Sequence, residues 1–182
     1  IKAGGPNYVV PLMRIKSDES NFEERAIAPE ISALSVFWQQ LATSRTNAAQ
    51  RVRELLGDED WAKLKHAISD YDQFASTEIR GQHDTLKLVG QDNLRRYVPM
   101  THVRIRIHPS DNWFDILARA AAVVAAGGRA TVSYPTENRE EDLELFEELT
   151  QEWAGDMEFV LESDEELVAA IQDGQVDRVR YT

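Results

Sequence analysis

The stretch of sequence that decides the fold class is a short alternating run that ends in a proline. It reads His102-Val103-Arg104-Ile105-Arg106-Ile107-His108-Pro109. Apolar and charged side chains alternate with a period of two, which predicts a β-strand with one apolar and one polar face. Pro109 lacks the backbone N–H that the strand would need next, so the strand ends there. We therefore expect the arginines and histidines of this run to be exposed on the polar face.

A helix is predicted directly after this strand. Ser110 or Asp111 is suited to cap its N-terminus, and apolar residues then recur at helical spacing over residues 114–125. The pair Gly127-Gly128 follows, and glycine supplies the left-handed residue that ends many helices.

Strands and helices keep alternating to the end of the chain. Strands are predicted over residues 129–133, 157–161 and 176–181. An acidic helix opened by Thr136 or Asn138 and a helix capped by Ser163 lie between them. Strands that alternate with helices predict right-handed crossovers and a mainly parallel sheet. The expected fold class is α/β, with a Rossmann-like sheet flanked by helices, and the order of its strands is left open.

The part before the sheet is predicted to be helical. One helix follows Pro29-Glu30, a second runs from Thr46 to Gly57, and a third begins near Asp58. The third helix has the clearest apolar stripe, formed by Trp61, Leu64, Ile68, Tyr71 and Ala75. An aromatic stripe at helical spacing is typical of a packed core.

A β-hairpin is predicted between the helical and α/β parts. Its strands are residues 85–89 and 94–98, and they flank the turn Gly90-Gln91-Asp92-Asn93. The expected organisation is thus an extended junction over residues 1–28, a helical segment over 29–80 and an α/β domain over 81–182.

The composition excludes several classes of protein. The 182 residues include 20 Lys and Arg against 32 Asp and Glu, a net charge of −12. Residues 101–182 hold 7 basic and 18 acidic side chains, which counts against a nucleic-acid partner. Cysteine is absent, so a thiol nucleophile, a disulfide and a thiolate metal site are excluded. No apolar run approaches the ~20 residues of a membrane span, and we expect a cytoplasmic protein.

The turns of the predicted sheet do not favour a dinucleotide. A Rossmann phosphate site needs a glycine-rich strand-to-helix turn, whereas residues 108–113, 135–142 and 162–166 contain no glycine and many carboxylates. Those carboxylates would repel a phosphate.

Other site chemistry is equally weak in the sequence. His102 and His108 flank two arginines and make a poor cation site, while His66 and His83 have no visible partner. The acidic run over residues 140–148 lacks the glycine turn of a calcium loop and is better explained as a solvated helix face. We assign no catalytic, cofactor-binding or metal residue.

Two motifs carry a resemblance to a known family. Lys2-Ala3-Gly4-Gly5-Pro6-Asn7-Tyr8 resembles the stretch that closes the aldehyde dehydrogenase module of the PutA-like family, the bifunctional proline dehydrogenase / L-glutamate γ-semialdehyde (Δ1-pyrroline-5-carboxylate) dehydrogenases. Residues 90–99, Gly90-Gln91-Asp92-Asn93-Leu94-Arg95-Arg96-Tyr97-Val98-Pro99, resemble a downstream segment of the same proteins. The alanine-rich helix and strand over residues 117–132 match as well. The resemblance covers residues 1–10 and 85–182.

The resemblance implies a piece of a longer enzyme of proline catabolism. The family's cysteine nucleophile, its general base and its NAD-binding turns precede the first motif, so none is carried onto this sequence. The resemblance implies a non-catalytic C-terminal domain that packs against the upstream dehydrogenase module of the same chain. NAD would belong to that module, and FAD to a fused proline dehydrogenase module. A homo-oligomer is compatible with the sequence, which leaves the oligomeric state open.

Two other readings remain open. One is a free-standing α/β module that binds a small molecule or nucleotide. Such a module would be indicated if NAD or a nucleotide quenched the fluorescence of Trp113 or Trp153. The other is an unrelated protein-interaction module. A domain that packs on a dehydrogenase should show an apolar contact surface, for which the candidate residues are Phe37, Trp38, Trp61 and Tyr71.

Overall fold

A computed structural model describes residues 32–90, 93–135, 140–153 and 155–180, which belong to one compact unit. The elements of its helical part are α1 (Ala33–Thr43), α2 (Asn47–Phe74) and the π-helix η2 (Ala75–Ile79). A small hairpin follows, made of β1 (His83–Asp84) and β2 (Leu94–Arg95). The remaining elements are β3 (Val103–Arg106), α3 (Trp113–Ala125), β4 (Ala130–Tyr134), α4 (Glu140–Leu149), the short 3-10 helix η3 (Gln151–Trp153), β5 (Met157–Leu161), α5 (Asp164–Gln172) and β6 (Arg178–Arg180). The sequence motif at residues 2–8 and the expected junction over 1–28 lie outside the described residues.

The four-stranded sheet is entirely parallel, with the order β5-β4-β3-β6. The chain starts in the interior at β3, adds β4 and β5 on one side, and then crosses to β6 on the other side. This is the order of the first four strands of a doubly wound sheet. The predicted α/β, Rossmann-like fold is therefore confirmed.

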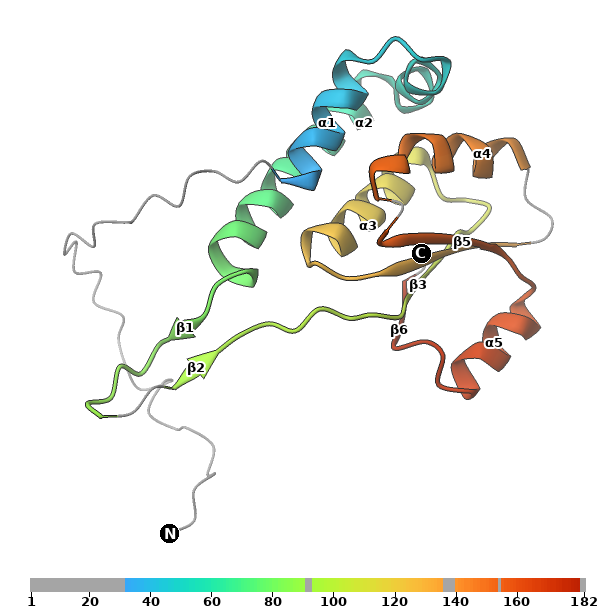
Figure 1. Cartoon of the computed structure of the whole chain (residues 1–182). Helices are drawn as coiled ribbons and strands as arrows, with labels where there is room; N and C mark the ends of the chain where they lie inside the picture. Colours follow the sequence, from blue (N-terminus) through green and yellow to red (C-terminus); the bar gives the residue numbers. More distant parts are fainter. Residues whose placement is uncertain (1–31, 91–92, 136–139, 154, 181–182) are drawn as a thin grey trace. The chain divides into compact units, whose positions relative to one another are not determined.

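Helices cover both faces of this sheet (Figure 1). α3 and α4 lie on one face, and α5 lies on the other. α1 and α2 form a further layer, in which α2 packs on α3 and α4. The aromatic ring of Phe146 in α4 meets that of Phe159 in β5 edge-on, at 5.5 Å between ring centroids.

The helix after β3 begins later than the sequence predicts. Neither Ser110 nor Asp111 caps it, because Asn112 accepts the amide of Asp115 at 2.8 Å and Asp115 accepts the amide of Asn112 in return. This capping box satisfies two helix-end amides at once. At the other end, Gly127 has the left-handed φ of 68° that the sequence predicts.

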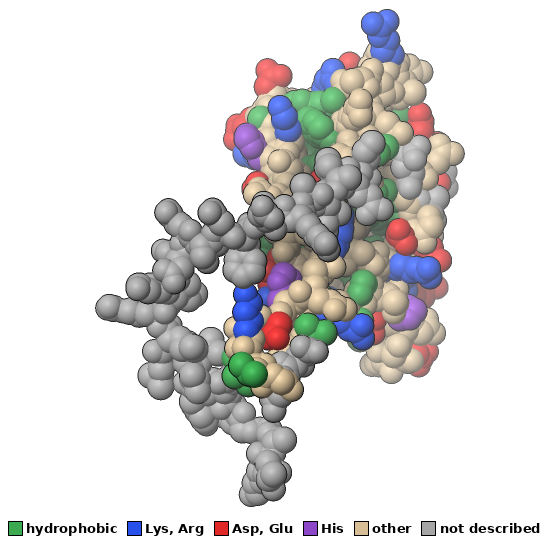
Figure 2. All heavy atoms as spheres, turned by 60° about the vertical axis from the view of Figure 1, so that its left-hand side comes forward, with side chains coloured by type: hydrophobic (Ala, Val, Ile, Leu, Met, Phe, Trp, Pro, Cys, Tyr) green, Lys and Arg blue, Asp and Glu red, His purple; other side chains and the backbone are tan. Residues whose placement is uncertain are grey.

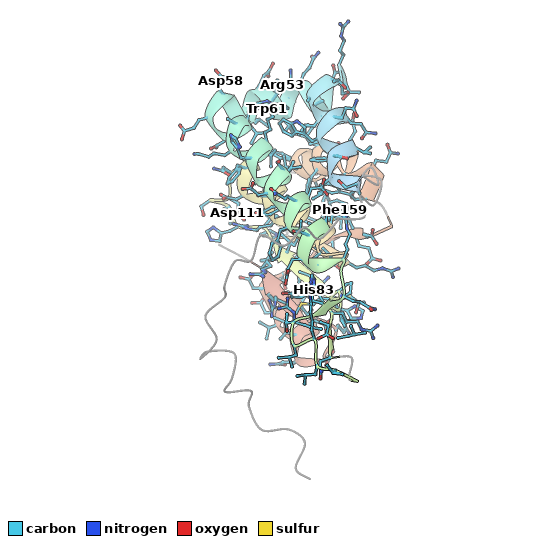
Figure 3. The ribbon with its side chains drawn as sticks, turned by 90° about the vertical axis from the view of Figure 1, so that its left-hand side faces the viewer. Arg53, Asp58, Trp61, His83, Asp111 and Phe159 are labelled. Atoms are coloured by element: carbon cyan, nitrogen blue, oxygen red, sulfur yellow. The ribbon has the colours of Figure 1, made fainter. Side chains whose placement is uncertain are left out.

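The two helices of the outer layer are joined by aromatic stacking. The ring centroids of Trp38 in α1 and Trp61 in α2 lie 4.7 Å apart. The guanidinium of Arg53 lies over the Trp61 ring, 4.5 Å from its centroid (Figure 3). Arg53 also donates to the carbonyl of Ala42 near the end of α1, at 2.6 Å. α1 begins after Ser32, which accepts the amide of Ser35, and so later than Pro29 suggests.

Gly57 interrupts α2 as the sequence predicts, with φ of 63° and ψ of −179°. An L-residue side chain is strained in this conformation whatever space surrounds it. We expect Gly57→Ala to lower the free energy of unfolding by about 1–3 kcal/mol, measured by urea denaturation. Gly155→Ala is the matched control, since Gly155 has no left-handed φ and no neighbour to clash with. Equal stability of the two variants would contradict this explanation of the kink.

The hairpin is present but shorter and shifted from its predicted position. β1 pairs with β2 in antiparallel register, His83 with Arg95 and Asp84 with Leu94. The first strand ends early because the Asp84 carboxylate accepts the amides of Leu86 and Lys87, at 3.1 and 2.9 Å. This local turn diverts the chain before residues 85–89 can form a strand.

The turn at Asp84 should depend on the ionisation of the Asp84 carboxylate at low pH. The amide of Lys87 is the main reason that the pKa of Asp84 is lowered, with smaller help from the Leu86 amide. Because the pKa of Asp84 is lower in the folded state, the ionised carboxylate stabilises the folded protein at pH values above the ordinary aspartate pKa. This stabilisation is lost as the pH falls through the folded-state pKa. In NMR titrations, Asp84 should titrate at lower pH than in a peptide of residues 81–98. The amide chemical shifts of Leu86 and Lys87 should change with pH at the same midpoint as Asp84. In Asp84→Ala this pH-dependent change should be absent.

The remaining element boundaries are close to those predicted. β5 coincides with residues 157–161, and Ser163 caps α5. β6 is shorter than the predicted strand over 176–181. The predicted caps Thr136 and Asn138 lie outside the described residues. Within the described ranges, no helix is both long enough and apolar enough to cross a membrane.

Candidate functional site

The candidate site is the carboxyl edge of the sheet between β3 and β6. The chain order reverses there, and open parallel sheets bind ligands at such a point. A hollow of about 800 Å³ opens at this edge. Its lining residues include Arg106 at the end of β3, His108 in the loop that follows, Asp164 of α5 and Val179 of β6.

Arg106 is the main buried charge of the hollow, with 9% of its surface exposed. Its Nη1 donates to Ser133 Oγ at 2.8 Å and to the carbonyl of Glu162 at 2.9 Å. Its Nη2 donates to a carboxylate oxygen of Asp164 at 2.6 Å. The guanidinium is thus held by β4, by the residue that follows β5 and by α5, and an incoming anion would have to displace Asp164.

The helix ends at this edge are occupied by the protein's own side chains. At α5, Ser163 accepts the amide of Glu166 at 3.2 Å, and the Glu166 carboxylate accepts the amide of Ser163 at 2.8 Å. The Asn112–Asp115 capping box does the same at α3. Helix N-termini attract anions through free amides, and at α3 and α5 two of these amides are already bound, one by a carboxylate and one by the N-cap side chain. The turn between β4 and α4 includes residues 136–139, which lie outside the described part.

The loop after β3 is fixed by a second carboxylate. Asp111 accepts the amide of His108 at 2.8 Å and binds Arg119 with both oxygens, at 2.7 and 3.0 Å. The hydrogen bonding that Arg119 donates to the Asp111 carboxylate is the main cause of the raised pKa of Arg119. Asp111 therefore shapes the loop and ties it to α3.

The alternation of residues 102–108 predicts that Arg104 and Arg106 lie on an exposed face, and this prediction is wrong. Arg104 lies 3.3 Å from Glu162, and these two side chains are 13% and 7% exposed. The alternation along β3 is real, but a strand inside a parallel sheet is covered on both faces. The polar face therefore lies under α5 and needs ion pairs. The charges that follow β5, Glu162 and Asp164, are the signal that could have indicated partners.

The histidines do not come together. His102 and His108 are exposed at opposite ends of β3, as predicted, and the ring of His108 contacts Ser110 Oγ at 2.6 Å. His83 has a partner that is not visible in the sequence, since its Nε2 lies 2.7 Å from the carbonyl oxygen of Glu78. His66 is exposed on α2. Over the described ranges, no three His, Asp or Glu side chains are grouped so that they could hold a metal ion.

The predicted apolar contact residues lie mainly in the interior. Phe37 is buried, and Trp38, Trp61 and Tyr71 are partly buried against the core. Large apolar side chains are instead exposed on the hairpin and the segment after it. They are Leu88, Val89, Leu94, Tyr97 and Val98.

Comparisons with protein-family models, with curated proteins and with solved structures found no match to this chain. The fold and the described part of the site define a class only: an α/β domain with a Rossmann-type strand order, in which the N-termini of α3 and α5 at the carboxyl edge of the sheet are capped by its own side chains.

Proposed function

We propose that this chain is the non-catalytic C-terminal domain of an NAD-dependent Δ1-pyrroline-5-carboxylate (glutamate semialdehyde) dehydrogenase of proline catabolism. It packs against the catalytic module of the same chain in the cytoplasm, and that module carries the NAD. The resemblance of residues 2–8 and 90–99 to the PutA-like proteins suggests this family. The observation that carries the packing role is the exposed apolar hairpin.

The hairpin is anchored at its base and open at its tip. Glu78 of η2 forms an ion pair with Arg95 and accepts a hydrogen bond from the hydroxyl of Tyr97 at 3.3 Å. Beyond this anchor, Val89 is fully exposed and Val98 is 76% exposed. Apolar side chains are visible on this part of the surface in the lower half of Figure 2. Several large apolar side chains exposed along one segment are what a contact surface would supply.

The capped helix ends support the non-catalytic part of the proposal. At the N-termini of α3 and α5 each capping box already engages two amides: the Asp115 or Glu166 carboxylate accepts one, and the side chain of Asn112 or Ser163 accepts the other. We expect NAD to cause no saturable quenching of Trp113 or Trp153 fluorescence in the 182-residue chain. Saturable micromolar quenching would instead favour a nucleotide-binding module, and the hollow between β3 and β6 would be its site.

The packing role is tested in the protein that contains the upstream coding sequence. That sequence should encode a dehydrogenase with a cysteine nucleophile. Hydrogen exchange at residues 86–98 should be slower with that module than in the 182-residue chain, and Val89→Glu should abolish the difference. Val168→Glu, on the exposed side of α5, is the matched control. Identical exchange with and without the module, or an upstream sequence with no dehydrogenase, would refute the proposal.

A further inference from the structure

A second hollow lies beside α3, on the face of the sheet opposite α5. Its volume is about 560 Å³. One wall is α3, a second is the extended segment over residues 97–100 that precedes β3, and Tyr71 and Ile79 close one end. Arg178 and Arg180 of β6 form the remaining rim.

The strand register explains why this hollow has an apolar wall and a basic rim. Arg178 and Arg180 pair with Val103 and Ile105 of β3, so all four side chains point to the face that carries α3. Val103 and Ile105 are buried. β6 is the edge strand of the sheet, and its side chains on this face stay exposed.

The side of α3 toward the hollow is built from small residues. Ala118, Ala122 and Ala126 follow at intervals of four, the spacing of one helix face, and all three line the hollow together with Phe114. The methyl groups leave room for an apolar body close to the helix. Met100 lines the hollow from the extended segment.

Two positive charges on the rim are unmatched. Within the described residues, Arg178 and Arg180 form no salt bridge and no side-chain hydrogen bond, although the chain carries a net charge of −12. The other charged groups of the hollow are already engaged. Arg119 is bound by Asp111 through two hydrogen bonds, and the Asp115 carboxylate accepts the amide of Asn112.

We propose that this hollow binds a small anionic amphiphile. Its carboxylate, phosphate or sulfate head lies on Arg178 and Arg180, and its apolar body lies along Phe114, Ala118 and Ala122. Arginine pairs well with planar or tetrahedral oxyanions, and ligand pockets of this size are mostly apolar with a few polar groups that orient the ligand. The hollow shares Tyr97 and Val98 with the exposed apolar segment that follows the hairpin. Its head site on Arg178 and Arg180 and its wall on α3 lie outside that segment, so this proposal does not depend on the proposed function.

Decanoate is a suitable probe, with decanol and decylammonium as ligands of matched chain length. Calorimetry on the 182-residue chain should show saturable binding of decanoate. Decanol should bind about tenfold more weakly or worse, because it lacks the charge-assisted hydrogen bonds, and decylammonium should not bind. The methyl NMR signals of Ala118 and Ala122 should shift as decanoate is added.

Two variants separate the head site from the apolar wall. Arg178→Gln with Arg180→Gln should weaken decanoate binding about tenfold or more, while Arg51→Gln with Arg129→Gln, which removes the same charge from exposed positions, should leave it unchanged. Ala122→Phe should block binding by filling the hollow, with circular dichroism confirming the fold. Equal affinity for decanol, full affinity in Arg178→Gln/Arg180→Gln, or a polypeptide segment found packed on Ala118 and Ala122 in solution would overturn the proposal.

Discussion

Arg104→Met should be among the most destabilising single substitutions in this protein. The variant leaves Glu162, which is 6% exposed, without its partner. An unpaired buried charge costs about 3–5 kcal/mol, so urea denaturation should show a loss of that order in the free energy of unfolding. The same measurement on Arg129→Met should show a change within about 0.5 kcal/mol, because Arg129 and Asp156 form an exposed pair.

The double variant Arg104→Met/Glu162→Met tests the cause. Replacing both members of a buried ion pair by apolar residues of similar volume is often neutral or stabilising. We expect the double variant to recover most of the stability that Arg104→Met loses. If the two substitutions simply add, the cost arises from lost packing of the arginine stem and the ion-pair explanation is wrong.

Leu64→Ala should destabilise the helical layer and the sheet together. Leu64 is completely buried in α2, which packs on α3. Truncation of a buried leucine costs about 2–5 kcal/mol, and for a chain of this size each kcal/mol lowers Tm by about 2–4 °C. A single transition, shifted downward as a whole, is the expected result in thermal denaturation followed by circular dichroism.

A neighbouring substitution provides the control for this prediction. Lys65→Ala changes an exposed residue of the same helix turn and should leave Tm almost unchanged. Two separate transitions in Leu64→Ala, with the later one at the wild-type temperature, would contradict the expected coupling. Residues 29–80 would then unfold as a unit of their own, independent of the α/β part.

The separate elements of the α/β part could be read from the sequence because their causes are local. Alternation along residues 103–107 predicts β3, and Gly127 predicts the end of α3, since both depend on neighbours within a few residues. The helix N-cap residues are harder to predict from the sequence, because several neighbouring side chains compete for the same amides. Asp111 was a reasonable cap by type, but it is engaged by His108 and Arg119.

The hairpin shows where local chemistry was misjudged. Gly90 and Asn93 indicate a turn, but Asp84 forms a turn of its own earlier in the chain and shortens the first strand. The exposed apolar side chains of this segment are not explained by contacts within the described unit. Their exposure is what directs the proposed function toward a partner module.

The amino-acid sequence by itself determined that this is an acidic, cysteine-free α/β protein with helices before a parallel sheet, because composition and short-range periodicity decide these properties. Only the tertiary structure decided the strand order β5-β4-β3-β6 and the burial of Arg104 and Arg106. It alone also placed Arg178 and Arg180 beside the alanines of α3. The physical reason is that a period of two separates the faces of a strand but does not say what will cover each face. That depends on residues far apart in the sequence, such as Arg106 and Asp164, which are 58 positions apart.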